Sequence, residues 1–211
     1  LVPAIARPDP SGGYELIAGH RRHHASELAG KETMPVIIRD LDDDAATIIM
    51  VDSNLQREEL LPSERAFAYK MKLEAMKRQG QRTDLTSSPL DNKLSGTTSA
   101  QQLSQKSGDS QPQIYRFIRL TELIPPVLQM VDDGKIAFRP AVELSYLSKD
   151  QQQSLHDTME CEDCTPSLAQ AIKMKEFSKD GRLTDEVILS IMQEEKPNQK
   201  PKFKFSFDRL K

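Results

Sequence analysis

The sequence has no tryptophan, only two cysteines and no long apolar run. A membrane-spanning helix needs roughly 20 consecutive apolar residues, and no stretch of this chain approaches that length. A secretory signal peptide needs a basic start followed by an apolar segment, and that pattern is also missing from the sequence. We therefore expect a cytoplasmic protein that does not associate with membranes.

The two cysteines, Cys161 and Cys164, form a single Cys-x-x-Cys pair with acidic neighbours. Two thiolates cannot complete a four-ligand zinc site, and His156 supplies at most a third ligand. Acidic neighbours also disfavour a reactive thiolate. We therefore interpret both cysteines as ordinary reduced thiols.

Neither sign of charge dominates, because 29 basic and 32 acidic side chains give a formal net charge of -3. A protein of this charge does not coat a polyanion by bulk electrostatics, so contacts with nucleic acid must come from local groups. Charged residues make up 29% of the sequence and hydrophobic residues 37%. This composition predicts an elongated molecule of two or three small units.

Residues 1–60 alternate strand-like and helical runs, which predicts a small α/β unit. The predicted strands are 2–6, 14–18 and 34–39, and the predicted helices are 21–28 and 45–53. Residues 10–13 (Pro-Ser-Gly-Gly) predict a hairpin turn between the first two strands. The acidic run 42–44 is interpreted as an N-terminal helix cap rather than a cation site. Because 1–7 looks like a strand entered midway, we expect further sequence upstream.

The motif Gly19-His20-Arg21-Arg22 joins a strand to a helix that stops at Gly30. A helix N-terminus offers free backbone N–H groups and a partial positive charge, and two guanidinium groups add bidentate donors for phosphate oxygens. The motif therefore indicates a polyphosphate cradle. The alternative is a solvated basic helix start that pairs with a carboxylate such as Glu27 or Asp40.

A long helix is predicted to begin at Pro62-Ser63-Glu64, because apolar residues follow at three- and four-residue spacing. We expect this helix to bridge two units and to end at Gly80. Residues 81–97 are polar and are interrupted by Pro89 and Gly96, so they are predicted to form a mobile loop.

Two helix starts follow this segment, because Thr98-Ser99-Ala100-Gln101 and Ser110-Gln111-Pro112-Gln113 both fit a capping box. Residues 107–109 between them predict a tight turn, and the second helix is predicted to cover 111–120. This arrangement is typical of a helix-turn-helix. The apolar residues expected at the contact between the two helices are Leu103, Ile114 and Phe117.

In a helix-turn-helix the first turns of the second helix enter the major groove of DNA. Gln and Arg suit bidentate base contacts, whereas a lysine or arginine placed beside the backbone clamps phosphates without reading sequence. The predicted DNA-binding residues are Lys106, Ser110, Gln111, Gln113, Tyr115, Arg116 and Arg119, with Lys106 and Arg119 as phosphate clamps. The alternative is a plain helical hairpin of a bundle, which Ser107 favours because this motif usually carries an apolar residue there.

The remaining chain is helical in character and predicts supporting helices. These helices are expected at 127–133, 139–147, 150–159, 167–177 and 184–194. Residues 202–207 alternate Lys and Phe, with Ser206 in the last Lys position, which indicates the start of a strand or a basic tail.

The first motif is similar to the Gly-Glu-Arg-Arg box of the ParB family of DNA-partition proteins. Asn54-Leu55-Gln56-Arg57, followed by Leu61-x-x-Glu64, resembles the second box of that family, and the helix-turn-helix follows in the family's order. The resemblance covers residues 1 to about 150. The amino-acid sequences of residues 69–80 and 134–137 also resemble those of family members carried by mobile elements of Gram-positive bacteria.

The resemblance implies an α+β protein with three parts. Residues 1–60 would form a small α/β sulfiredoxin-like nucleotide-binding domain, N-terminally incomplete in this chain. Residues 61–160 would form an all-α helix-turn-helix domain with supporting helices, and 161–211 would form a helical extension.

The implied function is site-specific DNA binding in plasmid or chromosome partition. The protein would be a homodimer that binds a palindromic, centromere-like DNA site, closes on DNA as a CTP-gated clamp, associates with the nucleoid or a plasmid and works with a ParA-type ATPase. CTP and Mg²⁺ are the implied cofactors. The implied nucleotide-binding residues are Gly19, His20, Arg21, Arg22, Asn54 and Arg57, and Asn54 would also help to place Mg²⁺.

Two residues depart from the family pattern: His20 replaces an acidic residue, and Ser53 replaces a glutamate, with Asp52 one position away. A hard cation prefers carboxylate oxygens, so these departures bear on metal coordination and on any slow hydrolysis of CTP. A second hypothesis is therefore a transcriptional repressor of a mobile element that has the same fold but no nucleotide control. A third, a phosphotransferase or nuclease, has no acid-base constellation to support it.

Overall fold

The computed structural model describes residues 3–55, 60–86 and 99–194. The chain divides into two compact units, Leu1–Thr121 and Glu122–Lys211, and each is described by itself. The first unit combines a small sheet with helices, whereas the described part of the second is helical. The predicted α+β class is confirmed.

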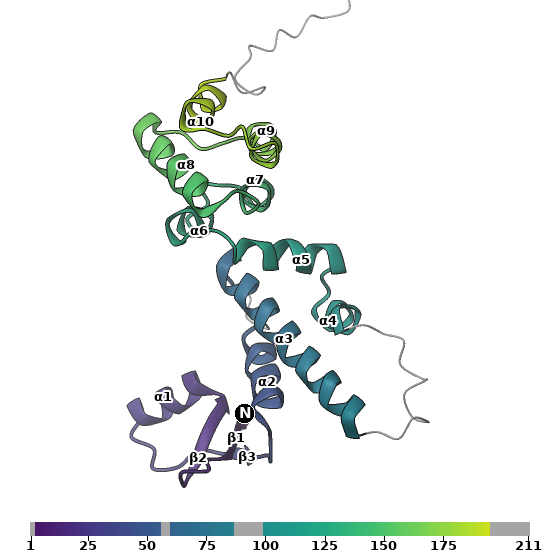
Figure 1. Cartoon of the computed structure of the whole chain (residues 1–211). Coiled ribbons are helices and arrows are strands. Elements are labelled where there is room, and N and C mark those ends of the chain that lie inside the picture. The colour runs from purple at the N-terminus through teal and green to yellow at the C-terminus, as the bar shows by residue number, and fades with distance from the viewer. Residues whose placement is uncertain (1–2, 56–59, 87–98, 195–211) are drawn as a thin grey trace, which may run out of the picture. The chain divides into compact units, whose positions relative to one another are not determined.

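The sheet of the first unit has three strands, β1 (Ala4–Pro8), β2 (Tyr14–Ala18) and β3 (Val36–Ile38), in the order β2-β1-β3. β1 runs antiparallel to β2 and parallel to β3 (Figure 1). The predicted hairpin turn connects β1 to β2, and its Asp9 carboxylate accepts hydrogen bonds from the Ser11 hydroxyl and backbone N–H at 2.6 and 2.8 Å. These bonds hold the pKa of Asp9 below its ordinary value.

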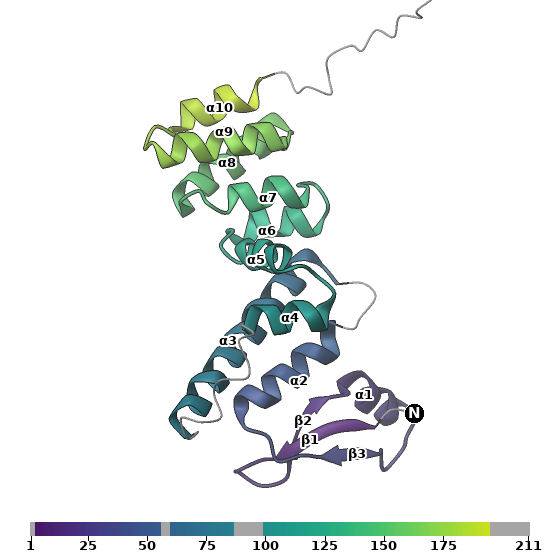
Figure 2. The same cartoon turned by 90° about the vertical axis from the view of Figure 1, so that its right-hand side faces the viewer.

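Three helices follow the hairpin: α1 (His20–Leu28), α2 (Asp43–Leu55) and α3 (Pro62–Thr86). The start of α2 confirms the predicted cap, because Asp42 Oδ1 accepts the backbone N–H of Ala45 at 2.8 Å. α2 packs against β2 on one side and against α3 on the other (Figure 2).

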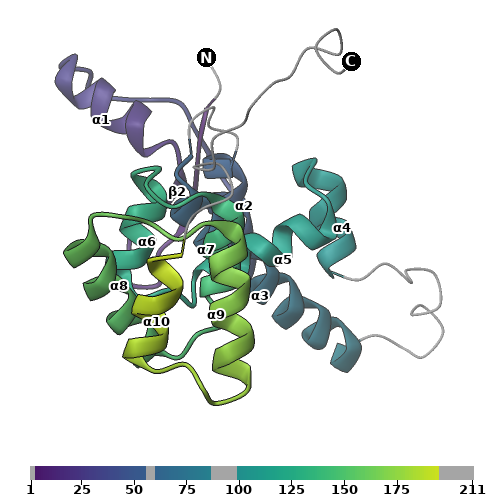
Figure 3. The same ribbon diagram turned by 90° about the horizontal axis from the view of Figure 1, so that it is seen from above.

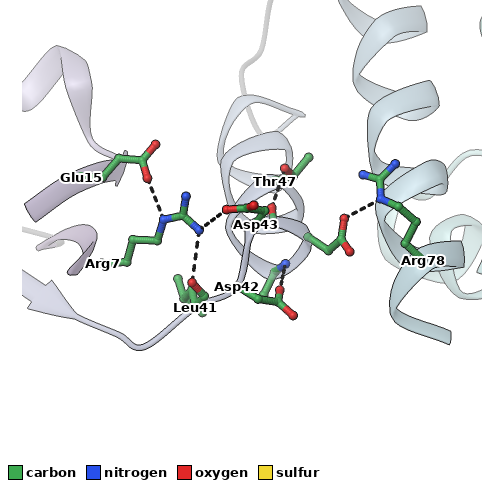
Figure 4. Close-up of polar contacts among 9 residues, drawn as sticks. Arg7, Glu15, Leu41, Asp42, Asp43, Thr47 and Arg78 are labelled. Atoms are coloured by element: carbon green, nitrogen blue, oxygen red, sulfur yellow. Dashed lines mark hydrogen bonds and ion pairs between the residues drawn. The ribbon is translucent and has the colours of Figure 1, made fainter. Parts of the chain in front are cut away.

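Charged side chains fix the first turn of α2 between the sheet and α3 (Figure 4). Arg7 of β1 contacts Glu15 of β2 at 2.6 Å and Asp43 at 2.8 Å. The next residue, Asp44, is 3% exposed and pairs with Arg78 of α3 at 2.7 Å. Besides capping the helix, the acidic run therefore contributes one carboxylate that is buried at a helix contact.

The predicted end of α3 is wrong, because the helix continues through Gly80 to Thr86. Glycine inside a helix costs about 1 kcal/mol relative to alanine, which tertiary contacts readily offset. Such contacts lie in the part of α3 that precedes Gly80, where Lys72 and Arg78 both pair with carboxylates of α2. Residues 81–86 are thus helical rather than a loop, and the rest of the expected loop lies outside the described residues.

The first unit is completed by α4 (Ser99–Ser107) and α5 (Gln111–Leu120), which both contact α3. Gly108 in the connecting turn has a φ of 76°, a left-handed conformation that favours glycine. The predicted inter-helix residues are all buried, as are apolar residues of α3, the helix that both α4 and α5 contact. The buried residues are Leu103, Ile114, Phe117, Tyr69 and Leu73.

The second unit contains α6 (Pro125–Asp132), α7 (Phe138–Leu144), α8 (Lys149–Glu162), α9 (Leu168–Lys179) and α10 (Asp185–Met192), which confirms the five predicted helices. α7 packs on α9, and α10 contacts both α8 and α9 (Figure 3). The predicted strand or tail at 202–207 lies outside the described residues. Across the part of the chain that the structure describes, no helix is both long and apolar enough to span a membrane.

Two buried glutamines stabilise the second unit. Gln152 is 1% exposed, accepts the backbone N–H of Ile124 at 2.8 Å and donates to the carbonyls of Leu147 and Glu122 at 3.0 and 3.2 Å. Gln170 donates to the carbonyl of Ile191 at 2.7 Å, at the end of α10. Each side chain satisfies buried backbone groups that would otherwise lack partners.

Candidate nucleotide pocket and DNA-recognition helix

Gly19 is the link between β2 and α1 and has a φ of 111°, a conformation that side chains rarely adopt. A Cβ atom added at this position would lie 2.7 Å from the Cβ of Ala4 in β1 and 3.3 Å from Nη2 of Arg22. Only glycine therefore lets the start of α1 lie this close to the sheet. No side chain caps α1, which leaves its N-terminal end accessible to an acceptor.

A pocket of about 170 Å³ opens at this helix start. One side carries Ile17 and the motif residues 19–22, and the other side carries residues of α2. The lining residues are Ile17, Gly19, His20, Arg21, Arg22, Met50, Ser53 and Asn54. The structure thus brings together five of the six predicted nucleotide-binding residues, and the sixth, Arg57, lies outside the described residues.

The two arginines of the motif differ in their surroundings. Arg21 is exposed, whereas Arg22 is half buried and its Nη1 atom is buried without a hydrogen-bond partner among the described residues. A buried guanidinium donor without an acceptor is energetically unfavourable, so an anion that entered this pocket would satisfy it. Glu27, one of the carboxylates considered for pairing with this helix start, lies 3.6 and 3.7 Å from the Nδ1 atoms of His23 and His24.

None of the described residues that line the pocket carries a carboxylate. Asp52, the acidic residue nearest the second motif, pairs instead with Lys72 of α3, whose side chain is 2% exposed. The hydroxyl of Ser53 donates to the carbonyl of Met50 at 2.9 Å. Asn54 is therefore the strongest oxygen donor that the pocket offers to a hard cation, and the described residues hold no cluster of three or more acidic, His or Cys side chains suited to a metal.

The second candidate site is the helix pair α4–α5. The Ser110 hydroxyl accepts the backbone N–H of Gln113 at 3.4 Å and so caps α5, as predicted. Ile114, Phe117 and Leu120 form its buried face. The opposite face is polar, and this amphipathic helix has the geometry of a recognition helix.

The predicted DNA-binding residues lie on or beside this polar face. Tyr115 is 49% exposed, and Ser110 and Arg116 are also exposed. Gln111, Gln113 and Arg119 are half buried, and Gln111 and Arg119 also make contacts within the protein. Lys106 lies in α4, and its side chain is outside the described part of the chain.

The turn before α5 is attached to α3 by polar contacts that the sequence pattern did not reveal. The Tyr69 hydroxyl donates to Asp109 Oδ2, and Arg65 Nη1 lies 3.8 Å from the same oxygen. Burial, together with this hydrogen bond, raises the pKa of Tyr69 to about 12, so the phenol stays a donor at neutral pH. The Ser107 hydroxyl accepts the backbone N–H of Asp109 at 3.4 Å, which explains a polar residue at this position.

Two family models match the sequence: the ParB N-terminal domain at residues 1–55 and the ParB HTH domain at residues 92–177. Stage 0 sporulation protein J of Bacillus subtilis is 34% identical over 137 residues, which cover 65% of this chain and 41% of that protein. The probable chromosome 1-partitioning protein ParB of Deinococcus radiodurans is 34% identical over 138 residues, 65% of this chain and 40% of that protein. The chain thus spans less than half the length of these relatives.

A solved structure also resembles the chain. The C-terminally truncated chromosome-partitioning protein ParB of Caulobacter crescentus, complexed to the centromeric parS site, has a TM-score of 0.51 and 24% sequence identity. The similarity covers 83% of this chain and 82% of that one. At this level of identity it supports the fold alone.

Proposed function

This chain belongs to the ParB family of DNA-partition proteins, and from that premise we propose that it binds a specific DNA site to serve in the segregation of a plasmid or chromosome. The observation that carries the proposal is the capped helix α5, which buries one face against α3 and α4 and presents a polar face with an exposed Tyr115 and Arg116. Matched ParB relatives are partition proteins by name.

The polar face of α5 supports a division of labour on DNA. Gln111, Gln113 and Arg116 lie in its first two turns, from which side chains reach base edges in the major groove. Arg119 lies in the last turn, where a cation contacts phosphate and also complements the helix dipole. A helix-turn-helix that reads DNA in this way commonly works as a dimer on a palindrome, so we propose a homodimer on a palindromic, centromere-like site, with a ParA-type ATPase as partner.

The pocket at Gly19–Arg22 supports a second part of the proposal, the binding of CTP through its phosphates. Arg22 supplies one donor through its buried Nη1, which has no partner among the described residues, and exposed Arg21 supplies a second. The uncapped start of α1 adds backbone N–H groups and its dipole. On this proposal, residues 1–60 form the domain that holds the nucleotide and residues 61–160 form the domain that binds DNA. Residues 161–211 form a helical extension after the DNA-binding domain.

Metal binding is the weakest part of this site. Asn54 would hold Mg²⁺ through its amide oxygen, and a bound triphosphate supplies most of the remaining oxygens that Mg²⁺ requires. Because Asp52 pairs with the buried Lys72, it is not available as an acidic ligand for the cation. We therefore propose nucleotide binding that depends on Mg²⁺ only modestly, with slow CTP hydrolysis at most.

The DNA proposal is tested by selecting duplexes from a random library with the wild-type chain and measuring their affinity by fluorescence anisotropy at fixed salt. Gln113→Ala should relax the preference at one base pair by about 1–3 kcal/mol. Arg119→Ala should weaken all duplexes to a similar degree, because a phosphate contact carries no sequence information. Gln153→Ala, an exposed glutamine of α8, is the matched control. Wild-type affinity in both α5 variants would contradict the assignment of α5.

The nucleotide proposal is tested by calorimetry with CTP, UTP, ATP and GTP, each with and without Mg²⁺. Arg22→Ala should weaken CTP by more than about tenfold, because a hydrogen bond to a charged group contributes about 1.5–3 kcal/mol. Arg139→Ala, which removes an exposed arginine of α7, should bind like wild type.

The absence of a carboxylate among the described residues that line the pocket favours one alternative, a DNA-binding repressor of a mobile element without nucleotide control. The same calorimetry separates the two. Selective DNA binding without binding of any nucleotide would support the repressor and refute the CTP-gated clamp.

A further inference from the structure

Asp109 stands at an unfavourable place for a DNA-binding protein, one residue before the N-cap of α5. The start of a recognition helix lies close to the phosphates of the duplex. A carboxylate that faced the DNA there would repel it and would offset the contribution of a nearby lysine or arginine.

The structure turns this carboxylate toward α3. Its Oδ2 atom accepts the hydroxyl hydrogen of Tyr69, which is 2% exposed, and lies 3.8 Å from Nη1 of Arg65. The Asp109 side chain retains only 26% of its exposure. A buried phenol and a guanidinium therefore hold the negative charge on the inner side of the turn.

The same residues of α3 also hold the body of α5. The ring of Tyr69 meets that of Phe117 edge to face, with centroids 5.9 Å apart and an interplanar angle of 61°. The guanidinium of Arg65 lies 5.4 Å from the centroid of the Phe117 ring. Tyr69 and Arg65 thus each contact both the turn and the helix.

The backbone of Asp109 is fixed from the side of α4. Its carbonyl accepts the Ser104 hydroxyl hydrogen at 2.8 Å, and its N–H donates to Ser107 Oγ at 3.4 Å. With side chain and backbone both held, the residue has little freedom to rotate its carboxylate outward.

We propose that Tyr69, Arg65 and Asp109 are positioning residues for DNA recognition, which set the pose of α5 from α3 and keep the Asp109 charge away from the duplex. The inference rests on the proposed DNA-binding function and adds a determinant of specificity that touches no base. Base contacts depend on the pose of α5 more steeply than phosphate contacts do, because bidentate pairs tolerate little displacement.

The test compares a duplex selected by the wild-type chain with a scrambled duplex of the same length. Tyr69→Phe removes one hydroxyl and keeps the ring against Phe117, so it should lower the ratio of selected to scrambled affinity about tenfold, the scale of losing a hydrogen bond to a charged group. Tyr14→Phe removes a hydroxyl from a residue of β2 that is 65% exposed, and should leave the ratio unchanged.

A double-mutant cycle distinguishes positioning from general destabilisation. Asp109→Ala should also lower the ratio, and adding Tyr69→Phe to it should have a smaller effect than Tyr69→Phe alone, because the carboxylate partner of the hydroxyl is already absent and only its contact with Ser107 remains. Asp109→Asn keeps a hydrogen-bond acceptor without the charge. Its ratio of selected to scrambled affinity should therefore be much closer to the wild-type value than that of Asp109→Ala. The thermal unfolding transition of each variant is first determined by circular dichroism. All affinities are then measured well below that temperature.

Additive effects of the two substitutions, or equal losses on selected and scrambled DNA, would overturn the inference and leave the proposed function intact. A wild-type chain that shows no preference among duplexes would instead remove the proposed function, and the inference with it.

Discussion

Replacing Gly19 by alanine tests the reason for a glycine at the start of α1, and Gly12 provides a matched control. The two glycines have nearly the same φ, 111° and 108°. A Cβ at position 12 would meet nothing within 4 Å, whereas a Cβ at position 19 would lie 2.7 Å from that of Ala4. The two substitutions share the backbone strain and differ in the steric contact.

The expected magnitudes follow from these two terms. A non-glycine residue held at such a φ costs about 1–3 kcal/mol, and this applies to Gly12→Ala and Gly19→Ala alike. Forcing a methyl group into an occupied space adds about 1–3 kcal/mol at position 19 alone. Gly19→Ala should therefore lower the free energy of unfolding by about 1–3 kcal/mol more than Gly12→Ala does.

The assay is urea denaturation followed by far-ultraviolet circular dichroism, since the chain has no tryptophan. Ala4→Gly in the Gly19→Ala background removes the closest contact and should recover part of the difference. Nucleotide affinity should fall in Gly19→Ala and not in Gly12→Ala, because the added Cβ lies 3.3 Å from Nη2 of Arg22. Equal destabilisation and equal affinity in the two variants would refute the close-approach argument.

Three further predictions concern buried polar groups. Asp52→Ala should destabilise the protein by more than Lys72→Met does, because Asp52→Ala leaves the Lys72 ammonium, which is 2% exposed, without its partner. The urea midpoints of the two variants measure the difference, and a lower midpoint for Lys72→Met would contradict the prediction. Gln152→Leu should cost about 2–4 kcal/mol by leaving several buried backbone groups unsatisfied, as measured by thermal unfolding against Gln153→Leu. The pKa of Tyr69 is raised to about 12, so its stabilising contribution is complete below pH 10 and is lost as pH rises toward 12; Tyr69→Phe should lose less stability than wild type over that window.

Most of the helices and strands could be predicted because their signals are local. The Ser110 cap, the glycine turn at Gly108 and the hairpin at 10–13 all act over a few residues, and the structure contains each of them. The end of α3 could not be predicted in this way. Gly80 is a local stop signal, but α3 continues past it to Thr86, and α2 pairs with Lys72 and Arg78 in the part of the helix that precedes Gly80.

In the candidate sites, too, some residues could be predicted from local motifs, whereas others depend on tertiary contacts. The motifs named most of the pocket residues, yet Ile17 and Met50 line it only because β2 and α2 meet there. The commitment of Asp52 to Lys72, which bears on metal binding, depends on how α2 packs against α3. Residue spacing along the chain contains no information about either contact.

By itself, the sequence determined the family, the order of the elements and the residue types available for phosphate and base contacts, because caps, turns and helical periodicity operate within a few residues. Tertiary structure alone decided which hydrogen-bond donors lack partners and which charged side chains face the protein interior. Among the described residues, Arg22 Nη1 is buried without a hydrogen-bond partner, and Gly19 lets the start of α1 lie close to Ala4. Asp109 faces inward because Tyr69, 40 residues earlier in the chain, reaches it from α3.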